Sequence, residues 1–394
     1  MTSQRLKKVQ QPVIPDVAAL IRQYSDTISL GQGMVHYAPP PSSMEILSEF
    51  GAQESVHKYQ GVNGDPQLIE ALREKLAAEN GIVVDRDRFI MVTAGSNMAF
   101  VHCVLALCDP GDEIIMMTPY YFNHEMAATM ANVRPVLVPT TADHQPCPER
   151  IAAAISPRTR AVVTISPNNP TGAVYTEAAL RQINALCHQH GLYHICDEAY
   201  EYFTYDDARH FSPGSIGGSA AHTISLFSFS KAYGMASWRV GYAVVPAHLR
   251  DAMAKIQDTI LICPPAICQQ VALAALQVGR SYCRAYIESI DQVRRLCLDR
   301  LASLRPRCHV PRSCGAFYLL AEVESPLPAM ELVQHLVRDY GVAVIPGNAF
   351  GITDRCCLRI AYGALTETTV AEGLDRLVAG LDALMPSRNG GCLA

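Results

Sequence analysis

Short apolar runs alternate with amphipathic runs along most of the chain after residue 60. The apolar runs predict buried strands, and the intervals between them predict helices. The expected strands are 89–93, 113–117, 135–138, 161–165, 192–196, 223–227 and 240–245, and the expected helices are 97–107, 121–131, 148–155 and 176–190. This alternation is typical of an α/β fold in which helices cover a mostly parallel sheet.

One of these helices has a clear predicted start. Asp65 precedes Pro66, which suits an N-cap residue followed by proline in the first helical position. Leu68, Leu72 and Leu76 then recur every four residues, so they are expected to share one buried face.

The pattern changes after about residue 247. Long helices are predicted over 247–260, 265–279 and 282–304, strands over 316–321, 342–345 and 357–361, and further helices over 328–340 and 366–384. The C-terminal third therefore predicts a second, smaller α/β domain.

Composition narrows the class of protein. The composition, 49% hydrophobic and 18% charged, is that of a globular protein, and a length of 394 residues predicts more than one domain. The net charge of -5 gives no reason to expect nucleic acid or an anionic membrane as a partner. The basic N-terminus has no apolar run behind it, so neither a signal peptide nor a membrane span is expected. The 14 scattered cysteines favour free thiols in the cytoplasm, and no metal site is predicted.

The chemistry centres on residues 228–241, which read Ser-Phe-Ser-Lys-Ala-Tyr-Gly-Met-Ala-Ser-Trp-Arg-Val-Gly. The amine of Lys231 can form a Schiff base with an aldehyde cofactor. The hydroxyls of Ser228 and Ser230 and the guanidinium of Arg239 can hold a phosphate. This run resembles the lysine signature of the fold-type I pyridoxal-phosphate aminotransferases of class I/II.

A second candidate phosphate site is Thr93-Ala-Gly-Ser-Asn97, which follows a strand and opens a helix. Gly95 permits close backbone approach, and the free N–H groups beside Ser96 and Asn97 can bind an anion. Alone this would be an ordinary turn, but beside the lysine motif we interpret it as part of the phosphate site.

The resemblance implies roles for further residues around the cofactor, pyridoxal 5'-phosphate. Tyr121 would stack on its ring, although this side chain could simply belong to the core. Asn169, in Ser166-Pro-Asn-Asn-Pro-Thr-Gly172, and Tyr200 would contact the phenolic oxygen. Asp197, rather than Glu198, would pair with the ring nitrogen, and Lys231 would shuttle the substrate proton.

It also implies the substrate contacts and the assembly. Arg359, in Leu358-Arg-Ile-Ala-Tyr-Gly363, would bind the substrate α-carboxylate through two hydrogen bonds. Gly33 and Tyr37 belong to a lid segment near the substrate, and Tyr59 would reach the phosphate of a neighbouring subunit, which implies a homodimer with shared active sites.

The family fold implies a large domain with a seven-stranded, mostly parallel sheet and a smaller α/β domain. We predict an N-terminal segment and lid over 1–45 that joins the small domain, a large cofactor-binding domain over 46–280 and a small domain over 281–394. The chain departs from the family wording at Ser237, where glycine is usual, and in the lid at Met34-Val-His-Tyr37.

The predicted activity is ping-pong transfer of an amino group between an L-amino acid and a 2-oxo acid. Asn97 stands where one aspartate-selective branch of the family has lysine, so no cation is evident for a second carboxylate, and an aromatic or methionine-like amino donor is favoured. Aspartate stays an alternative, with Lys58 of a partner subunit as the second cation. A β-eliminating lyase is another alternative. A non-catalytic regulatory module is less favoured, because few residues precede the lid.

Overall fold

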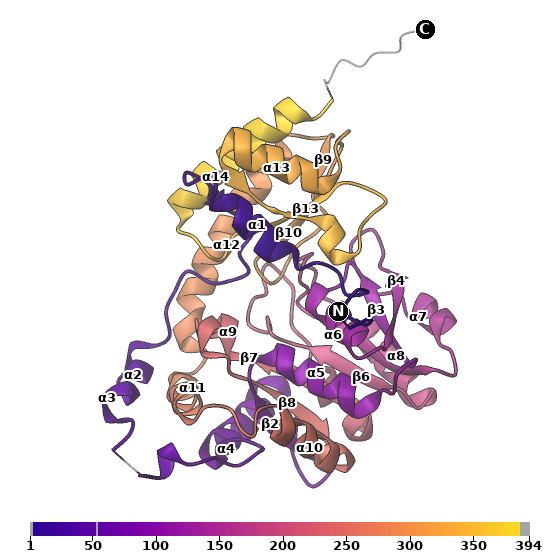
Figure 1. The fold of residues 1–394 in the computed structure, drawn as a ribbon, viewed down its shortest axis with the longest axis vertical. Helices are drawn as coiled ribbons and strands as arrows, with labels where there is room; N and C mark the ends of the chain where they lie inside the picture. The colour runs from indigo at the N-terminus through magenta and orange to yellow at the C-terminus, as the bar shows by residue number, and fades with distance from the viewer. Residues whose placement is uncertain (1–2, 53, 387–394) are drawn as a thin grey trace.

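A seven-stranded sheet forms the centre of the larger lobe in the computed structural model, which describes residues 3–52 and 54–386 (Figure 1). The strands lie in the order β2-β8-β7-β6-β5-β3-β4, and only β8 is antiparallel to its neighbours. Their bounds are β2 Arg88–Thr93, β3 Glu113–Thr118, β4 Arg134–Pro139, β5 Thr159–Ile165, β6 Tyr193–Asp197, β7 Thr223–Ser228 and β8 Gly241–Pro246. The mostly parallel sheet predicted from the sequence is confirmed.

Helices cover both faces of this sheet, which explains why its strands are apolar throughout. Along β3, Ile114 packs into one apolar cluster with Phe100, while Ile115 packs into another with Ile183. The covering helices are α4 Pro66–Lys75, α5 Ser96–Leu107, α6 Phe122–Met130, α7 Pro148–Ala154, α8 Glu177–Gln189, α10 Arg250–Ile260 and α11 Ala266–Val278. The predicted helices are present, with ends that differ by at most three residues.

Helix α4 begins as predicted and ends in a way that the sequence did not indicate. Asp65 Oδ1 accepts hydrogen bonds from the backbone N–H groups of Gln67, at 2.7 Å, and Leu68, at 3.2 Å. After Lys75 the chain widens into a π-helical turn, η2, over Leu76–Asn80.

The smaller lobe is built around the antiparallel sheet β12-β13-β10-β9. Its elements are α12 Ser281–Ala302, β9 Cys308–His309, β10 Tyr318–Val323, α13 Ala329–Tyr340, β11 Val342–Ala343, β12 Ile345–Pro346, β13 Cys357–Ala361 and α14 Glu367–Leu384. The N-terminal segment joins this lobe: α1 Val13–Ile21 contacts α13, and β1 Ile28–Ser29 pairs in parallel with β11. The domain boundaries stay a prediction.

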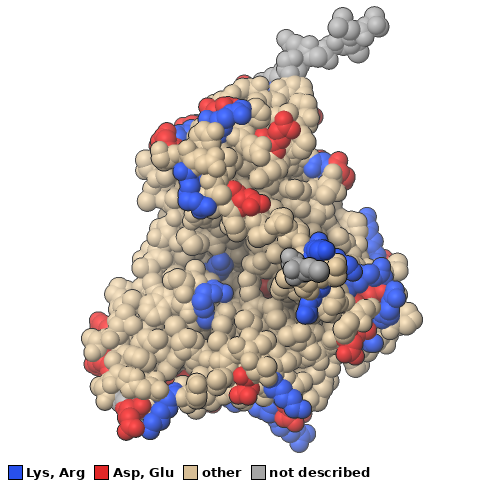
Figure 2. All heavy atoms as spheres, viewed as in Figure 1, with Lys and Arg blue, Asp and Glu red and all other residues tan. Residues whose placement is uncertain are grey.

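Short elements connect these layers. They are α2 Pro41–Met44, α3 Ile46–Glu49, η1 Glu54–His57, η3 Pro213–Ser215, η4 Ser219–Ala221, α9 Phe229–Ala232, η5 Ala236–Trp238, η6 Ala247–Leu249 and η7 Gly347–Phe350. Figure 2 shows acidic and basic side chains interspersed over the viewed face, which is hollowed between the two lobes. Within residues 3–52 and 54–386, no helix is long and apolar enough to cross a membrane, and no cluster of His, Cys, Asp or Glu could hold a metal ion.

Candidate active site

One cavity collects most of the residues that the sequence singled out. It is lined by Ser96, Asn97, Tyr121, Ile165, Asn169, Asp197, Ala199, Tyr200, Ser228, Ser230, Lys231 and Arg239. Only Ile165 and Ala199 among these were not candidate site residues. The cavity lies where β5, β6 and β7 end. This is where a ligand is expected, since open α/β sheets bind their ligands beyond the carboxyl ends of the parallel strands.

Lys231 stands on the short helix α9, and its side chain is half-buried in the cavity lining. Its Nζ donates a hydrogen bond to the backbone oxygen of Gly33 at 2.6 Å. Burial and, to a smaller extent, the nearby charges of Arg359 and Arg239 lower the pKa of Lys231 to about 8, while Asp197 opposes the shift. A larger fraction of this amine is therefore neutral near pH 7 than for an ordinary lysine, and a neutral amine is the nucleophilic form.

The end of the cavity lined by Ser96, Asn97 and Arg239 is suited to bind an anion. Within the described chain no side chain caps α5, so its first N–H groups remain available beside Ser96 and Asn97. Gly95 has a φ of 82°, and a Cβ there would collide with the Arg239 guanidinium. The backbone N–H of Ser230 donates to Ser228 Oγ at 3.1 Å.

Arg239 takes a backbone conformation that is rare for its type. Its φ is 54°, and its Nη1 donates to the backbone oxygen of Ala236 at 2.8 Å. Ser237 lies inside the 3₁₀ turn η5, so the position where the family usually has glycine needs no left-handed backbone here. The strain falls on Arg239 instead, as is common where a structure must aim a functional side chain.

Asp197 has a neighbour that the sequence analysis missed. Nε2 of His124 lies 3.1 Å from Asp197 Oδ2, and the His124 ring stacks on Phe100 with centroids 3.9 Å apart. The other oxygen, Oδ1, accepts a hydrogen bond from the backbone N–H of Ala199. His124 lies three residues after Tyr121 on α6, but nothing in the sequence indicates that this helix meets the end of β6.

Tyr200 also has a partner from outside the motifs. Its hydroxyl lies 2.8 Å from the hydroxyl of Tyr318, which stands on β10 of the smaller lobe. Asn169 Nδ2 lies 3.5 Å from the same Tyr200 oxygen. Burial raises the pKa of Tyr200 well above its usual value and that of Tyr318 to about 12, so both are neutral donors at physiological pH.

Arg359 enters the site from β13 and is completely buried. Its Nη1 donates to Asn169 Oδ1 at 3.0 Å and its Nη2 to the backbone oxygen of Gly31 at 2.6 Å. The guanidinium also lies over the rings of Tyr318 and Phe350, 4.8 and 5.1 Å from their centroids. In the described part of the chain its Nε has no partner, which leaves a buried donor for a ligand.

Five candidates are not part of the cavity lining: Gly95 and Arg359, described above, and Gly33, Tyr37 and Tyr59. Gly33 approaches so closely that a Cβ would sit 2.5 Å from the Tyr318 hydroxyl. The Tyr37 hydroxyl is shared between the backbone oxygens of Lys231 and Ala232, so it braces the lysine turn. Tyr59 is 82% exposed in the single protomer and touches nothing in the cavity.

Comparison with known proteins agrees with this geometry. Residues 25–377 match the model of the family described as aminotransferase class I and II. The chain belongs to this family, its fold is that of the fold-type I enzymes, and it is a transaminase. The class predicted from the lysine motif is thus confirmed.

Several relatives are similar over nearly their whole length. An aromatic aminotransferase of Arabidopsis thaliana is 34% identical, with 98% of this chain and 97% of that protein covered. A probable aspartate/prephenate aminotransferase of Thermus aquaticus is 35% identical over 96% and 99%. The solved structure of Thermus thermophilus aspartate aminotransferase with maleate superposes with a TM-score of 0.88 at 33% identity, covering 97% of this chain and 100% of that one.

Proposed function

We propose that this transaminase binds pyridoxal 5'-phosphate on Lys231 and uses it to move an amino group between an L-amino acid and a 2-oxo acid. The observation that carries the proposal is a cavity lined by Lys231, whose pKa is lowered, and by Asn169, which accepts a hydrogen bond from Arg359, a buried arginine whose Nε has no partner in the described chain. Bound there, the cofactor supplies an aldehyde and an electron-withdrawing ring that weakens the substrate Cα–H bond.

The residues of the chain divide the remaining work. Ser228, Ser230, Arg239 and the N–H groups at the start of α5 fit a phosphate dianion, because all of them present donors or positive charge to one end of the cavity. Asp197 is suited to hold a proton on the ring nitrogen. Its partner His124 keeps the carboxylate in place.

The substrate end is suited to an α-amino acid. The guanidinium of Arg359 can bind the α-carboxylate in a two-pronged manner, and Asn169 and Gly31 orient it. Lys231 Nζ then lies where it can take the proton from the substrate Cα and later return it. Tyr200 and Asn169 are suited to hold the phenolic oxygen, and Tyr121 to stack on the ring.

Absorbance of the purified protein tests this proposal. After incubation with pyridoxal phosphate, a visible band should form. Excess phenylalanine alone should remove the band, and phenylpyruvate should restore it, because each half of a ping-pong reaction proceeds without the other substrate. Absence of any band would refute the cofactor proposal, while pyruvate and ammonia release from a cysteine conjugate with the band retained would favour the eliminating lyase.

For the donor we propose an aromatic or methionine-like amino acid. In the lining contributed by one protomer's described residues, the cations are Lys231 and Arg239, and Asn97 offers no charge to a distal carboxylate. The aromatic relative supports this choice, but relatives of equal identity are named for aspartate, which keeps aspartate as the second candidate. A kcat/KM for aspartate above that for phenylalanine would reverse the order.

We further propose that the chain acts as a cytoplasmic homodimer with shared sites. The exposed Tyr59 ring does not line the cavity of its own protomer, which suits contact with a partner. Every cysteine in the described part of the chain is a free thiol, as is usual in a reducing compartment.

A further inference from the structure

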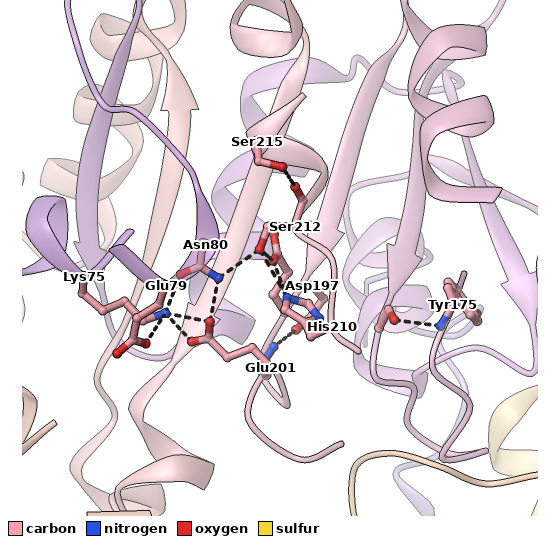
Figure 3. A network of polar contacts seen from close by, with 12 residues as sticks. Lys75, Glu79, Asn80, Tyr175, Asp197, Glu201, His210, Ser212 and Ser215 are labelled. Atoms are coloured by element: carbon pink, nitrogen blue, oxygen red, sulfur yellow. Dashed lines mark hydrogen bonds and ion pairs between the residues drawn. The ribbon is translucent and has the colours of Figure 1, made fainter. Parts of the chain in front are cut away.

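A largely buried polar network lies beside the turn that follows Asp197, and its residues do not line the cavity (Figure 3). It is built on Glu198 and Glu201, which directly follow Asp197 and Tyr200. Neither carboxylate lines the cavity, and the side chains of Glu198 and Glu201 are only 2% and 12% exposed. Buried carboxylates are costly unless they are paired, so their partners decide whether the turn can keep its shape.

Glu201 is paired with Lys75 from α4. Lys75 Nζ lies 2.6 Å from both oxygens of Glu201, and the two side chains are only 6% and 12% exposed. The ammonium also sits 4.8 Å from the ring centroid of Phe227, next to the strand end that carries Ser228. Because both side chains have such small exposed fractions, solvent has little access to this ion pair.

Glu198 is held from a different segment. Its Oε2 lies 2.8 Å from His210 Nε2 and accepts a hydrogen bond from the Ser212 hydroxyl. Asn80 joins the two halves, because its Nδ2 donates to both Glu201 Oε2, at 2.7 Å, and Ser212 Oγ, at 2.9 Å.

The π-helical turn η2 makes this link geometrically feasible. Lys75 and Asn80 are five residues apart, and Lys75 Nζ donates to Asn80 Oδ1 at 2.8 Å. In an α-helix, side chains five apart diverge, whereas the wider π-turn brings them to one side. Such turns are rare and concentrate at functional sites, which is an independent sign that this placement matters.

We propose that Lys75 and Asn80 are positioning residues for the transamination site. Lys75 neutralises Glu201, and Asn80 binds Glu201 directly and Glu198 through Ser212. These contacts hold the turn from which Asp197 and Tyr200 reach the cavity. This inference rests on the proposed function. Neither residue lines the cavity, so neither is a catalytic residue.

Lys75→Met tests the proposal in the cofactor-loaded enzyme, because it leaves Glu201 buried without a cation. We expect kcat with phenylalanine to fall by about 10- to 100-fold, while KM changes by less than about threefold since Arg359 is untouched. The pH midpoint of the visible band should rise by roughly half a unit, because Tyr200, a donor to the phenolic oxygen, and Asp197, an acceptor from the protonated ring nitrogen, are displaced.

A double variant and a matched control separate positioning from lost stability. Lys75→Met/Glu201→Leu removes both charges and should recover kcat by about tenfold over Lys75→Met. Arg294→Met removes another buried cation, 4% exposed and paired with Asp291, which does not line the cavity either. It should lower the denaturation midpoint but leave the band midpoint unchanged.

The outcomes distinguish the two proposals. If the wild type binds the cofactor and transaminates while Lys75→Met keeps its kcat and band midpoint, the positioning role is refuted and the proposed function stands. If the wild type forms no visible band, the proposed function itself fails. Should Lys75→Met not fold, Asn80→Ala must lower kcat by about three- to tenfold and move the band midpoint, and an unchanged midpoint there would overturn the proposal.

Discussion

Lys231 illustrates how burial changes the chemistry of a single residue. Because its pKa is lowered to about 8, its neutral fraction should fall about tenfold for each pH unit below 8 and level off above it. In the cofactor-free enzyme, the rate of visible-band formation with pyridoxal phosphate should follow this curve. A rate that keeps rising to about pH 10 would show an ordinary lysine.

Replacement of the same residue separates binding from turnover. Lys231→Ala should lose transamination by at least about 10³-fold, since both the nucleophile and the proton carrier are removed. The phosphate contacts remain, so the affinity for pyridoxamine phosphate, measured by fluorescence titration, should change by less than about tenfold. Undiminished turnover would contradict the assignment of Lys231.

Replacement of Arg359 should separate binding of the substrate carboxylate from the other contacts of the site. Arg359→Lys keeps the charge but loses the planar fork, and a lost charge-assisted hydrogen bond costs about 1.5–3 kcal/mol, so kcat/KM for phenylalanine should fall by roughly 10- to 150-fold. Phenethylamine, which has no carboxylate, serves as the control substrate and should lose far less. An equal loss for both compounds would argue against carboxylate binding.

Helix α4 shows what local sequence can specify at the scale of an element. Asp65 accepts two backbone hydrogen bonds at the helix start, so Asp65→Ala should lower the free energy of unfolding by about 1 kcal/mol. The shift in the urea midpoint measures it. Asp65→Asn should restore most of the loss, and an Ala variant as stable as the wild type would show that the cap is dispensable.

The far end of the same helix shows the limit of a local pattern. The four-residue spacing of Leu68, Leu72 and Leu76 predicts an α-helix through this region, and these side chains are fully buried. The chain nevertheless widens into a π-turn after Lys75. Asn80, the last residue of this turn, binds Glu201 and Ser212 from elsewhere in the chain, and a pattern of apolar residues cannot indicate such contacts.

At the scale of the whole molecule, the exposed Tyr59 leads to a complementation test. If Tyr59 serves the partner's site, mixing Tyr59→Ala with Lys231→Ala subunits creates mixed dimers with one intact site each. Random exchange should then restore up to about a quarter of wild-type activity, measured at low cofactor concentration. Activity no greater than the sum of the two separate variants would place Tyr59 outside the shared site.

The candidate site was predictable to the extent that its residues follow strands. Asn169, Asp197 and Ser228 could be found because each follows or ends an apolar run with a distinctive local spelling. His124 and Tyr318 could not, because the first sits within an ordinary helix and the second within an apolar strand. Their importance comes from the elements that they meet, 73 and 118 positions away from Asp197 and Tyr200 in the chain.

Local periodicity and short motifs were enough to predict the family, the succession of strands and helices along the chain, and the lysine, aspartate and arginine of the candidate site. They could not predict which distant side chains face one another in the folded protein: Arg359 with Asn169, Asp197 with His124, and Lys75 with Glu201. Such pairs join residues far apart in the chain, and whether a buried charge is tolerated depends on the partner that folding brings to it.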